Sequence, residues 1–427
     1  DYFKYKVNDI TGNEIPSQII NLEEEFPKEI RPRALIFIAE DVPPFGYKIF
    51  TLHKLNSKPE ERKSLPVEYI ENEFYKITFD KSTGLIKSIF DKKNKKEVLS
   101  GPGNSLQLFE DKPQRWDAWN IGYTGKVWKP KFEKIELIEK GPVRTVVRAY
   151  FNFFNPDSNA KRINAHPTLN YPNSFFICDT ILYNKINRIE FKTYVDWWEK
   201  HTLLKTSFDV NVQNQKATFE IPFGFIQRPT TMKNSWEKAR FEVPALKWID
   251  LSQSDYGVSI LTRSKYGYDI HGNRMRITLL RSPIDPDPTA DRGVHYIEYA
   301  LVPHMKDWRE SNIPRIAHDY NNPLLSIILK KKSRGRLPLS KSFLCIKPDN
   351  ILLSCLKLSE DGESLILRIY ETYGKNTNAE ITLPFKPMEV YKVNFLEEGM
   401  EKLPVNGNKI RIFIAKNKVL TLKILRK

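Results

Sequence analysis

Cysteine, methionine and glycine are scarce in this sequence of 427 residues, with 3, 5 and 18 copies. The three cysteines, Cys178, Cys345 and Cys355, are odd in number and show no CxxC spacing, so the sequence predicts neither a disulfide framework nor a thiolate zinc site. No segment approaches the roughly 18 uninterrupted apolar residues of a membrane helix. Residues 1–5 also lack the basic-then-apolar order of a signal peptide. We therefore expect a cytoplasmic protein with no membrane partner.

An initiator methionine and the common catalytic motifs are missing as well. Because the chain starts at Asp1 inside a strand-like run, we expect a fragment, a processed product or one half of something larger. GxSxG, GxGxxG, P-loop and Cys/His nucleophile spacings do not occur. His295 and His304 form neither an HxxxH nor an HxD pair, so a metal site made wholly by this chain has little support.

The charge balance is basic, with 68 Lys and Arg against 52 Asp and Glu, a net charge of +16. Such a balance raises the question of a nucleic-acid partner. However, the lysines are scattered, and their densest groups, at 92–96 and 330–332, lie beside predicted turns. This spread is typical of a solvated surface, so a nucleic-acid role ranks last. Many lysines with few Cys and Met also fit a heat-adapted organism.

Short alternating runs bounded by turn residues dominate the chain, which exceeds the size of one core and predicts about two or three domains. Apolar residues fall on one parity through much of 143–153, as in a half-buried antiparallel strand. The best helix candidate, 308–319, is short, and 56–66 has the composition of a linker. We predict an all-β fold: a large antiparallel, galactose-mutarotase-like supersandwich with smaller β-sandwich domains at either end. The predicted domains are a small β-domain remnant with linker at 1–62, the supersandwich at 63–340 and an immunoglobulin-like sandwich at 341–427.

One stretch, 104–120, starts as an alternating strand and breaks after Pro113 into a loop with Arg115, Trp116, Asp117 and Trp119. Two indoles beside a carboxylate are what a sugar ring needs, because aromatic faces stack on its C–H face and the carboxylate accepts from its hydroxyls. The alternative is that both tryptophans plug a sheet edge, since large aromatics are mostly buried.

Other strand ends carry polar groups. Asp196 and Glu199, next to His201, could supply the two carboxylates, about 5 to 10 Å apart, of general acid and base chemistry. The alternative is that this Trp-rich strand end packs the sandwich with its charges facing water. Further polar tips are predicted at strand ends, where loops carry function on a rigid sheet: Tyr266, Tyr268, Asp269 and Arg281.

Together these stretches resemble the post-catalytic half of the α-mannosidases of glycoside hydrolase family 38, especially the bacterial, archaeal and vacuolar branch. The likeness runs through most of residues 34–323. Its strings are Asn104-Ser-Leu-Gln-Leu-Phe-Glu-Asp-Lys-Pro-Gln-Arg-Trp-Asp-Ala-Trp-Asn120, Val195-Asp-Trp to His201, Leu204-Lys205, Phe223-Gly-Phe-Ile-Gln-Arg-Pro-Thr230, Ser235-Trp236, Lys247-Trp-Ile-Asp-Leu-Ser252, Lys265-Tyr-Gly-Tyr-Asp269 and Leu279-Leu-Arg-Ser-Pro283.

The resemblance implies a retaining hydrolase of terminal α-mannosides, with an aspartate nucleophile and a second carboxylate beside a zinc ion. In the family those groups sit in an N-terminal α/β domain and a helical bundle, which this chain lacks, so no catalytic residue and no zinc ligand carries over. The β-sandwich half packs on that domain and lends loops to the rim of its pocket. Expected substrate-contacting residues are Trp116, Asp117 and Trp119, with Tyr268, Asp269 and Arg281 second, and the expected partners are mannosides and the missing N-terminal domain or chain.

Two other functions stay open. One is a carbohydrate-binding module or non-catalytic subunit that holds oligosaccharide through Trp116 and Trp119. The other is a mutarotase-like sugar epimerase or lyase, which would need Asp196, Glu199 or His295 to converge in an open cleft. The linkage preference and the oligomeric state, including homo-oligomers, are left open by the sequence.

Overall fold

The computed structural model describes residues 5–22, 33–55, 67–154, 174–329, 335–399 and 401–426. These residues form strands β1–β35 and two short helices, α1 (Ser235–Lys238) and α2 (Ile313–Asn321). The long strands pair antiparallel, which confirms the predicted all-β, antiparallel fold. Neither helix in the described part of the chain has the length and apolarity to cross a bilayer.

The chain divides into two compact units. The large sandwich unit consists of Glu60–Phe219 and Gln227–Trp308, and the terminal unit of Asp1–Pro59, Glu220–Ile226 and Arg309–Lys427. The linker predicted at 56–66 lies outside the described residues. The three domains predicted with boundaries at 62/63 and 340/341 stay a prediction.

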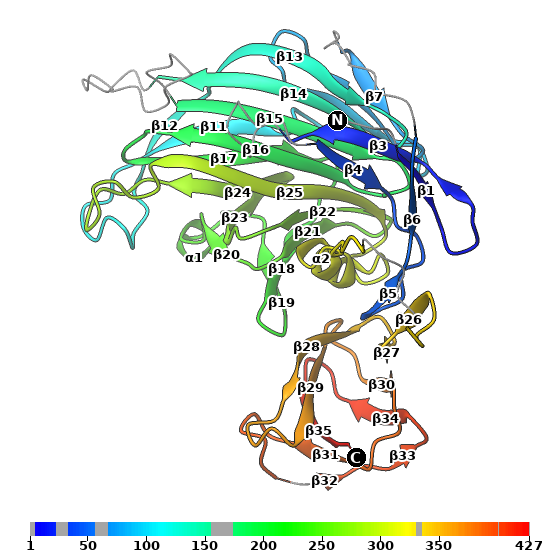
Figure 1. Ribbon diagram of the computed structural model, residues 1–427. Helices are drawn as coiled ribbons and strands as arrows, with labels where there is room; N and C mark the ends of the chain where they lie inside the picture. Colours follow the sequence, from blue (N-terminus) through cyan, green and yellow to red (C-terminus); the bar gives the residue numbers. More distant parts are fainter. Residues whose placement is uncertain are drawn as a thin grey trace. The chain divides into compact units, whose positions relative to one another are not determined.

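A nine-stranded sheet is the largest element, in the order β13-β14-β15-β16-β25-β22-β21-β18-β19 (Figure 1). Its alternation follows the residues of β14: Val147, Ala149 and Phe151 enter the core, while Arg148 and Tyr150 lie on the other face. The strands are β13 (Lys131–Lys140), β14 (Arg144–Phe153), β15 (Ser174–Tyr183), β16 (Ile189–Trp197), β18 (Lys216–Ile221), β19 (Gly224–Pro229), β21 (Trp248–Ser252), β22 (Tyr256–Thr262) and β25 (Gly293–Met305).

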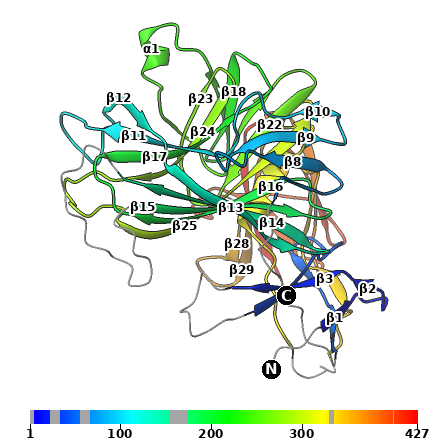
Figure 2. The ribbon, with the colours of Figure 1, turned by 90° about the horizontal axis from the view of Figure 1, so that it is seen from above.

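A six-stranded sheet, ordered β12-β11-β17-β24-β23-β20, and a four-stranded sheet, ordered β10-β9-β8-β7, complete the large sandwich unit. Seen from above, β11, β17 and β24 lie beside β15 and β25 (Figure 2). One core joins the sheets, with Leu108 and Ile277 from the six-stranded sheet among Phe176 and Leu301 from the nine-stranded one. The strands are β7 (Tyr69–Glu71), β8 (Tyr75–Phe79), β9 (Ile86–Asp91), β10 (Lys96–Glu97), β11 (Ser105–Asp111), β12 (Tyr123–Trp128), β17 (Thr202–Asp209), β20 (Val243–Pro244), β23 (Gly267–His271) and β24 (Arg274–Arg281).

The terminal unit contains a second sandwich with its own core around Ile351, Leu367, Ile381 and Leu422. The four-stranded sheet holds β27 (Cys345–Lys347), β30 (Thr377–Thr382), β34 (Lys409–Ile414) and β33 (Val405–Asn406), and the five-stranded sheet holds β28 (Ile351–Leu358), β29 (Ser364–Glu371), β35 (Val419–Leu425), β31 (Glu389–Val393) and β32 (Glu401–Lys402).

The remaining strands of the terminal unit form small sheets: β1 (Tyr5–Asn8) with β2 (Glu14–Ile15) and β6 (Thr51–Lys54), β3 (Ser17–Asn21) with β4 (Arg33–Phe37), and β5 (Gly46–Lys48) with β26 (Ser340–Ser342). The helix predicted at 308–319 is found as α2, which begins five residues later and ends two residues later than predicted. It begins after Asn312, whose φ of 58° is left-handed, and it carries Pro314 in its first turn.

Candidate functional site

The connection from β11 to β12, residues 112–122, presents two tryptophans to solvent. Trp116 and Trp119 are 68% and 69% exposed. Their ring centroids lie 6.2 Å apart and their planes are nearly perpendicular, at 89°. The backbone of Trp116 has a φ of 60°, a conformation that costs free energy for a bulky residue and is often found at functional sites. We call residues 112–122 the indole loop; it does not plug a sheet edge.

Arg281, at the end of β24, donates hydrogen bonds to the indole loop and to the residue before it. Its Nε donates to Asp111 Oδ2 at 2.6 Å, and the Asp111 side chain is only 1% exposed. Its two Nη atoms donate to the carbonyl oxygens of Asp117 at 2.6 Å, Ala118 at 2.9 Å and Asn120. Charge-assisted hydrogen bonds are the strong ones, and arginine supplies its donors in a rigid fork. In this structure Arg281, predicted as a substrate contact, binds the indole loop with its guanidinium donors. We call this set of hydrogen bonds the Arg281 clasp.

Asp117 ties the indole loop to a second loop, residues 282–292. Its Oδ2 accepts from the Ile284 N–H at 2.6 Å and the Asp285 N–H at 3.3 Å, and it lies 3.2 Å from His201 Nε2. Burial raises the pKa of Asp117, but the Ile284 N–H and His201 outweigh it and bring the pKa below its ordinary value. Figure 1 shows the two loops side by side, in cyan and yellow-green.

The neck of the indole loop is closed by short-range contacts. Lys112 N–H donates to the Gly122 carbonyl at 2.8 Å, and Gly122 N–H donates to Asp111 Oδ1 at 2.7 Å. A Cβ at Gly122 would lie 2.5 Å from the Pro113 backbone, so only glycine fits. Trp119 and Asn120 both donate backbone N–H groups to the Trp116 carbonyl, at 2.9 and 2.8 Å. The backbone that carries the two indoles is thus held in place before anything binds, which lowers the entropy cost of binding.

A buried charge cluster supports the same sheet. Lys205 of β17 is fully buried and its Nζ contacts Glu242 and, at 2.5 Å, Asp269 Oδ2. Arg276 Nε donates to the other oxygen of Asp269 at 2.8 Å. Burial lowers the pKa of Lys205, but Glu242 and Asp269 outweigh this and raise it, so the ammonium stays charged. The pair formed by Lys205 and Glu242 was not predicted from the sequence. The one available signal was a lysine inside a strand with few other charges.

Two further predicted contacts, Tyr268 and Asp269, lie inside β23 rather than at its tip. Their exposed fractions are 0% and 1%. The Tyr268 hydroxyl lies 2.8 Å from the Leu246 carbonyl and 2.6 Å from that of Lys265. The expectation of polar strand tips is therefore wrong for these two residues, because they lie in the middle of a separate strand, β23. Tyr266, just before β23, is 58% exposed.

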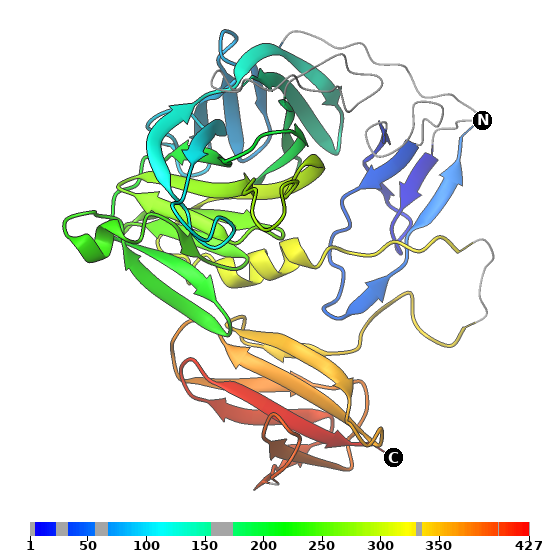
Figure 3. The same ribbon diagram turned by 90° about the vertical axis from the view of Figure 1, so that its left-hand side faces the viewer.

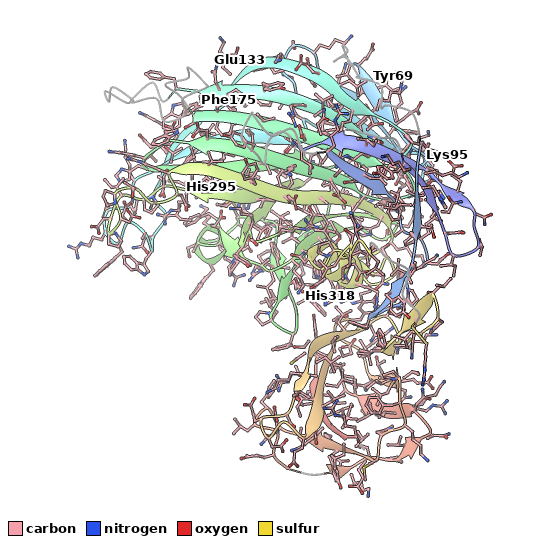
Figure 4. All side chains as sticks on the ribbon, in the orientation of Figure 1. Tyr69, Lys95, Glu133, Phe175, His295 and His318 are labelled. Atoms are coloured by element: carbon pink, nitrogen blue, oxygen red, sulfur yellow. The ribbon has the colours of Figure 1, made fainter. Side chains whose placement is uncertain are left out.

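The residues expected of an epimerase or lyase each contact a different partner. Asp196 accepts from Trp198 Nε1 at 2.6 Å, and Glu199, with 0% exposure, accepts from the Ser174 hydroxyl at 2.7 Å. His295 Nε2 lies 2.7 Å from the Asp291 carbonyl, near the start of β25 (Figure 4). Across the described ranges, no group of three or more His, Cys, Asp or Glu side chains is arranged to hold a metal ion. The described residues therefore do not fit a zinc site.

Comparison with known proteins gives two family matches. Residues 70–289 match the glycosyl hydrolases family 38 C-terminal domain, and residues 350–422 match the glycosyl hydrolases family 38 C-terminal beta sandwich domain. The first match spans the indole loop, Lys205 and Arg281.

Curated relatives and a solved structure agree with these matches. Alpha-mannosidase G of Dictyostelium discoideum is 32% identical over 77% of this chain and 30% of its own length, and human alpha-mannosidase 2C1 is 29% identical over 83% and 33%. The chain thus spans about a third of the length of these relatives. The crystal structure of an alpha-mannosidase from Enterococcus faecalis superposes with a TM-score of 0.76 at 16% identity, over 99% of this chain and 51% of that one, so the two share a fold.

Proposed function

The chain belongs to glycosyl hydrolase family 38, and from this membership we propose that it is the β-sandwich portion of a retaining, zinc-dependent α-mannosidase acting on terminal α-D-mannosides. The proposal places the nucleophile, the acid/base and the zinc ligands in an N-terminal portion of the longer protein. The alpha-mannosidase relatives, which extend well beyond the matched part, support it. We also propose a cytoplasmic location, which the unpaired state of Cys178, Cys345 and Cys355 supports.

The observation that supports a mannoside-contacting role for this chain is the pair of exposed indoles, Trp116 and Trp119, on the indole loop. Covering one such side chain with a sugar ring contributes about 1.5–3 kcal/mol of binding free energy. Because the planes of Trp116 and Trp119 are perpendicular, one ring face can stack on the C–H face of a mannose while the other indole presents an edge. Arg281, Asp111 and Asp117 act behind them as positioning residues.

The carboxylates beside the indoles are poorly suited to break a glycosidic bond. A general acid must be protonated near neutral pH, which needs a raised pKa. The pKa of Asp117 is instead lowered, and its Oδ2 accepts two backbone N–H groups. Asp111 is engaged on both oxygens, by Gly122 and Arg281. In this proposal they hold the loop, and the chemistry falls to groups outside this chain.

The test is hydrolysis of an aryl α-mannoside with zinc present. The chain of residues 1–427 should release no aglycone by itself, and release should appear when the N-terminal portion of the longer protein is supplied. Activity of the isolated chain would overturn the assignment of the catalytic residues to the N-terminal portion.

A second candidate function is a carbohydrate-binding module, which the exposure of Trp116 and Trp119 favours. Calorimetry against mannose oligomers separates the two, because a module should bind without any other chain. Trp119→Ala should then abolish the heat, while Trp236→Ala, which removes a 79% exposed indole from α1, should leave it unchanged. We do not pursue an epimerase or lyase, because Glu199 has no exposed surface.

A further inference from the structure

Five aliphatic side chains follow α2 in a run that lies in solvent. Leu324, Leu325, Ile327, Ile328 and Leu329 are 65%, 91%, 83%, 78% and 67% exposed. Residues 323–329 belong to no helix or strand, and Figure 3 shows the chain leaving the yellow helix as a single trace. No backbone hydrogen bond of Leu324–Leu329 is found among the described residues. We call residues 324–329 the aliphatic segment.

The segment begins from a well-fixed point. Ile313, Pro314, Ala317 and Tyr320 of α2 are buried, so the helix is anchored by its own apolar face. Its last turn is closed by the amides of Asn321 and Asn322, which donate to the carbonyls of Ala317 and His318 at 2.9 and 2.7 Å. The exposure of the aliphatic segment is therefore not the fraying of a weak helix.

The pattern within the segment indicates burial on both sides. In an extended conformation, alternate side chains point to opposite faces. Leu325, Ile327 and Leu329 would share one face, and Leu324 and Ile328 the other. Apolar residues on both faces of a strand indicate that both faces are buried. Runs of exposed aliphatic residues are rare unless they form an interface. Lying flat on a surface would cover one face alone, so the segment fits insertion into a groove.

We propose that the aliphatic segment is a docking strand that inserts into an apolar groove, with an acidic rim, on the N-terminal portion of the longer protein. The naming of this partner rests on the proposed function. Most of the length of the matched relatives lies outside the matched part, which supplies a partner of sufficient size. The sequence continues as Lys330-Lys331-Lys332 with Arg334 and Arg336, which is why the rim is acidic.

A second copy of the chain is a poorer occupant. Two copies that paired through this segment would bring two such basic stretches together, and each chain carries a net charge of +16. Like charges placed opposite each other oppose association. The same charges favour an acidic partner.

Amide hydrogen exchange tests the proposal on two samples: the chain of residues 1–427 and the longer protein expressed from its complete gene. Amides of the aliphatic segment should exchange freely in the first and about 100-fold more slowly in the second. Leu325→Asp with Ile327→Asp should abolish that slowing in the longer protein. The matched control is Leu356→Asp with Leu358→Asp, which alters two leucines of β28 that are 51% and 50% exposed and should leave the slowing intact.

The outcomes separate this proposal from the proposed function. Slow exchange in a longer protein that does not hydrolyse aryl α-mannosides would support the docking strand and overturn the proposed function. Free exchange in an active longer protein would overturn the docking strand alone. Slow exchange already in the 1–427 chain, together with the mass of a dimer in solution, would overturn the docking strand. The segment would then be buried against a second copy of the chain.

Discussion

The guanidinium of Arg281 and the carboxylate of Asp111 lie 2.6 Å apart beneath the loop that carries Trp116 and Trp119. This ion pair joins the end of β24 to the end of β11, and the same guanidinium gathers three loop carbonyls. Among the described residues, Arg281 therefore makes more hydrogen bonds to the indole loop than any other side chain outside the loop.

Arg281→Ala should release the indole loop. Removing one partner of a buried ion pair costs about 3–5 kcal/mol, because Asp111 keeps its charge without a counterion. Trypsin should then cleave after the exposed Arg115 at a much higher rate than in the unchanged chain. The control is Arg274→Ala on the same strand, whose pair with Asp209 is half-exposed and contributes about 0–1 kcal/mol. Equal cleavage rates in the two variants would contradict the clasp.

Asp117 should set the pH at which the two loops separate. Because its pKa is lowered in the folded chain, its contribution to stability is present above the ordinary aspartate value, about 4, and is lost as the pH falls below it. Fluorine NMR of 5-fluorotryptophan, assigned with Trp116→Phe and Trp119→Phe, should give constant indole signals from pH 8 to 5 and a change below about 4.

Asp117→Asn is the control for this titration, since the variant carries no charge to lose and should show no change at low pH. The same low-pH change in Asp117→Asn would contradict the assignment of the transition to Asp117.

Lys205→Met should destabilise the large sandwich unit without touching the indole loop. The substitution leaves Glu242 and Asp269 as buried carboxylates with one counterion fewer, at a cost of about 3–5 kcal/mol in urea unfolding. Lys96→Met removes a half-exposed pair with Asp255 and should cost about 0–1 kcal/mol. If both lysine variants unfold at the same urea concentration, the buried cluster is not a source of stability.

The sequence predicted the fold well because strands with one buried face carry their own alternation. The apolar residues that fall on one parity in the sequence, among them Val147, Ala149 and Phe151, are the ones that face the core from β14. Helix α1 was not predicted, because a four-residue helix has almost no periodicity. The indole loop was found from composition, since Trp, Asp and Arg cluster beside Pro113.

The roles within the site were not readable from the sequence. Arg281 lies 170 positions from Asp111, and nothing local in either stretch indicates that they meet. Tyr268 and Asp269 were expected at a strand tip, because they follow the apolar run at 258–261, yet they belong to a separate strand, β23, that pairs with β24. Such assignments depend on sheet register, which long-range contacts decide.

Trp119→Ala should impair recognition of mannosides by the assembled protein while leaving its stability unchanged, because a 69% exposed side chain contributes little to folding. The loss of one stacking surface, about 1.5–3 kcal/mol, corresponds to a fall of about 10- to 150-fold in kcat/KM. Trp236→Ala, the matched substitution on α1, should have kcat/KM close to that of the unchanged protein. A normal kcat/KM in Trp119→Ala would contradict the proposal that the indole loop contacts the mannoside.

The central claim is tested most directly by measuring aryl α-mannoside hydrolysis, with zinc, in three samples: the chain of residues 1–427, the N-terminal portion of the longer protein, and the two together. We predict no hydrolysis by the chain, and hydrolysis by the mixture that exceeds that of the N-terminal portion. Hydrolysis by the chain of residues 1–427 in isolation, or a mixture no more active than the N-terminal portion, would contradict the account.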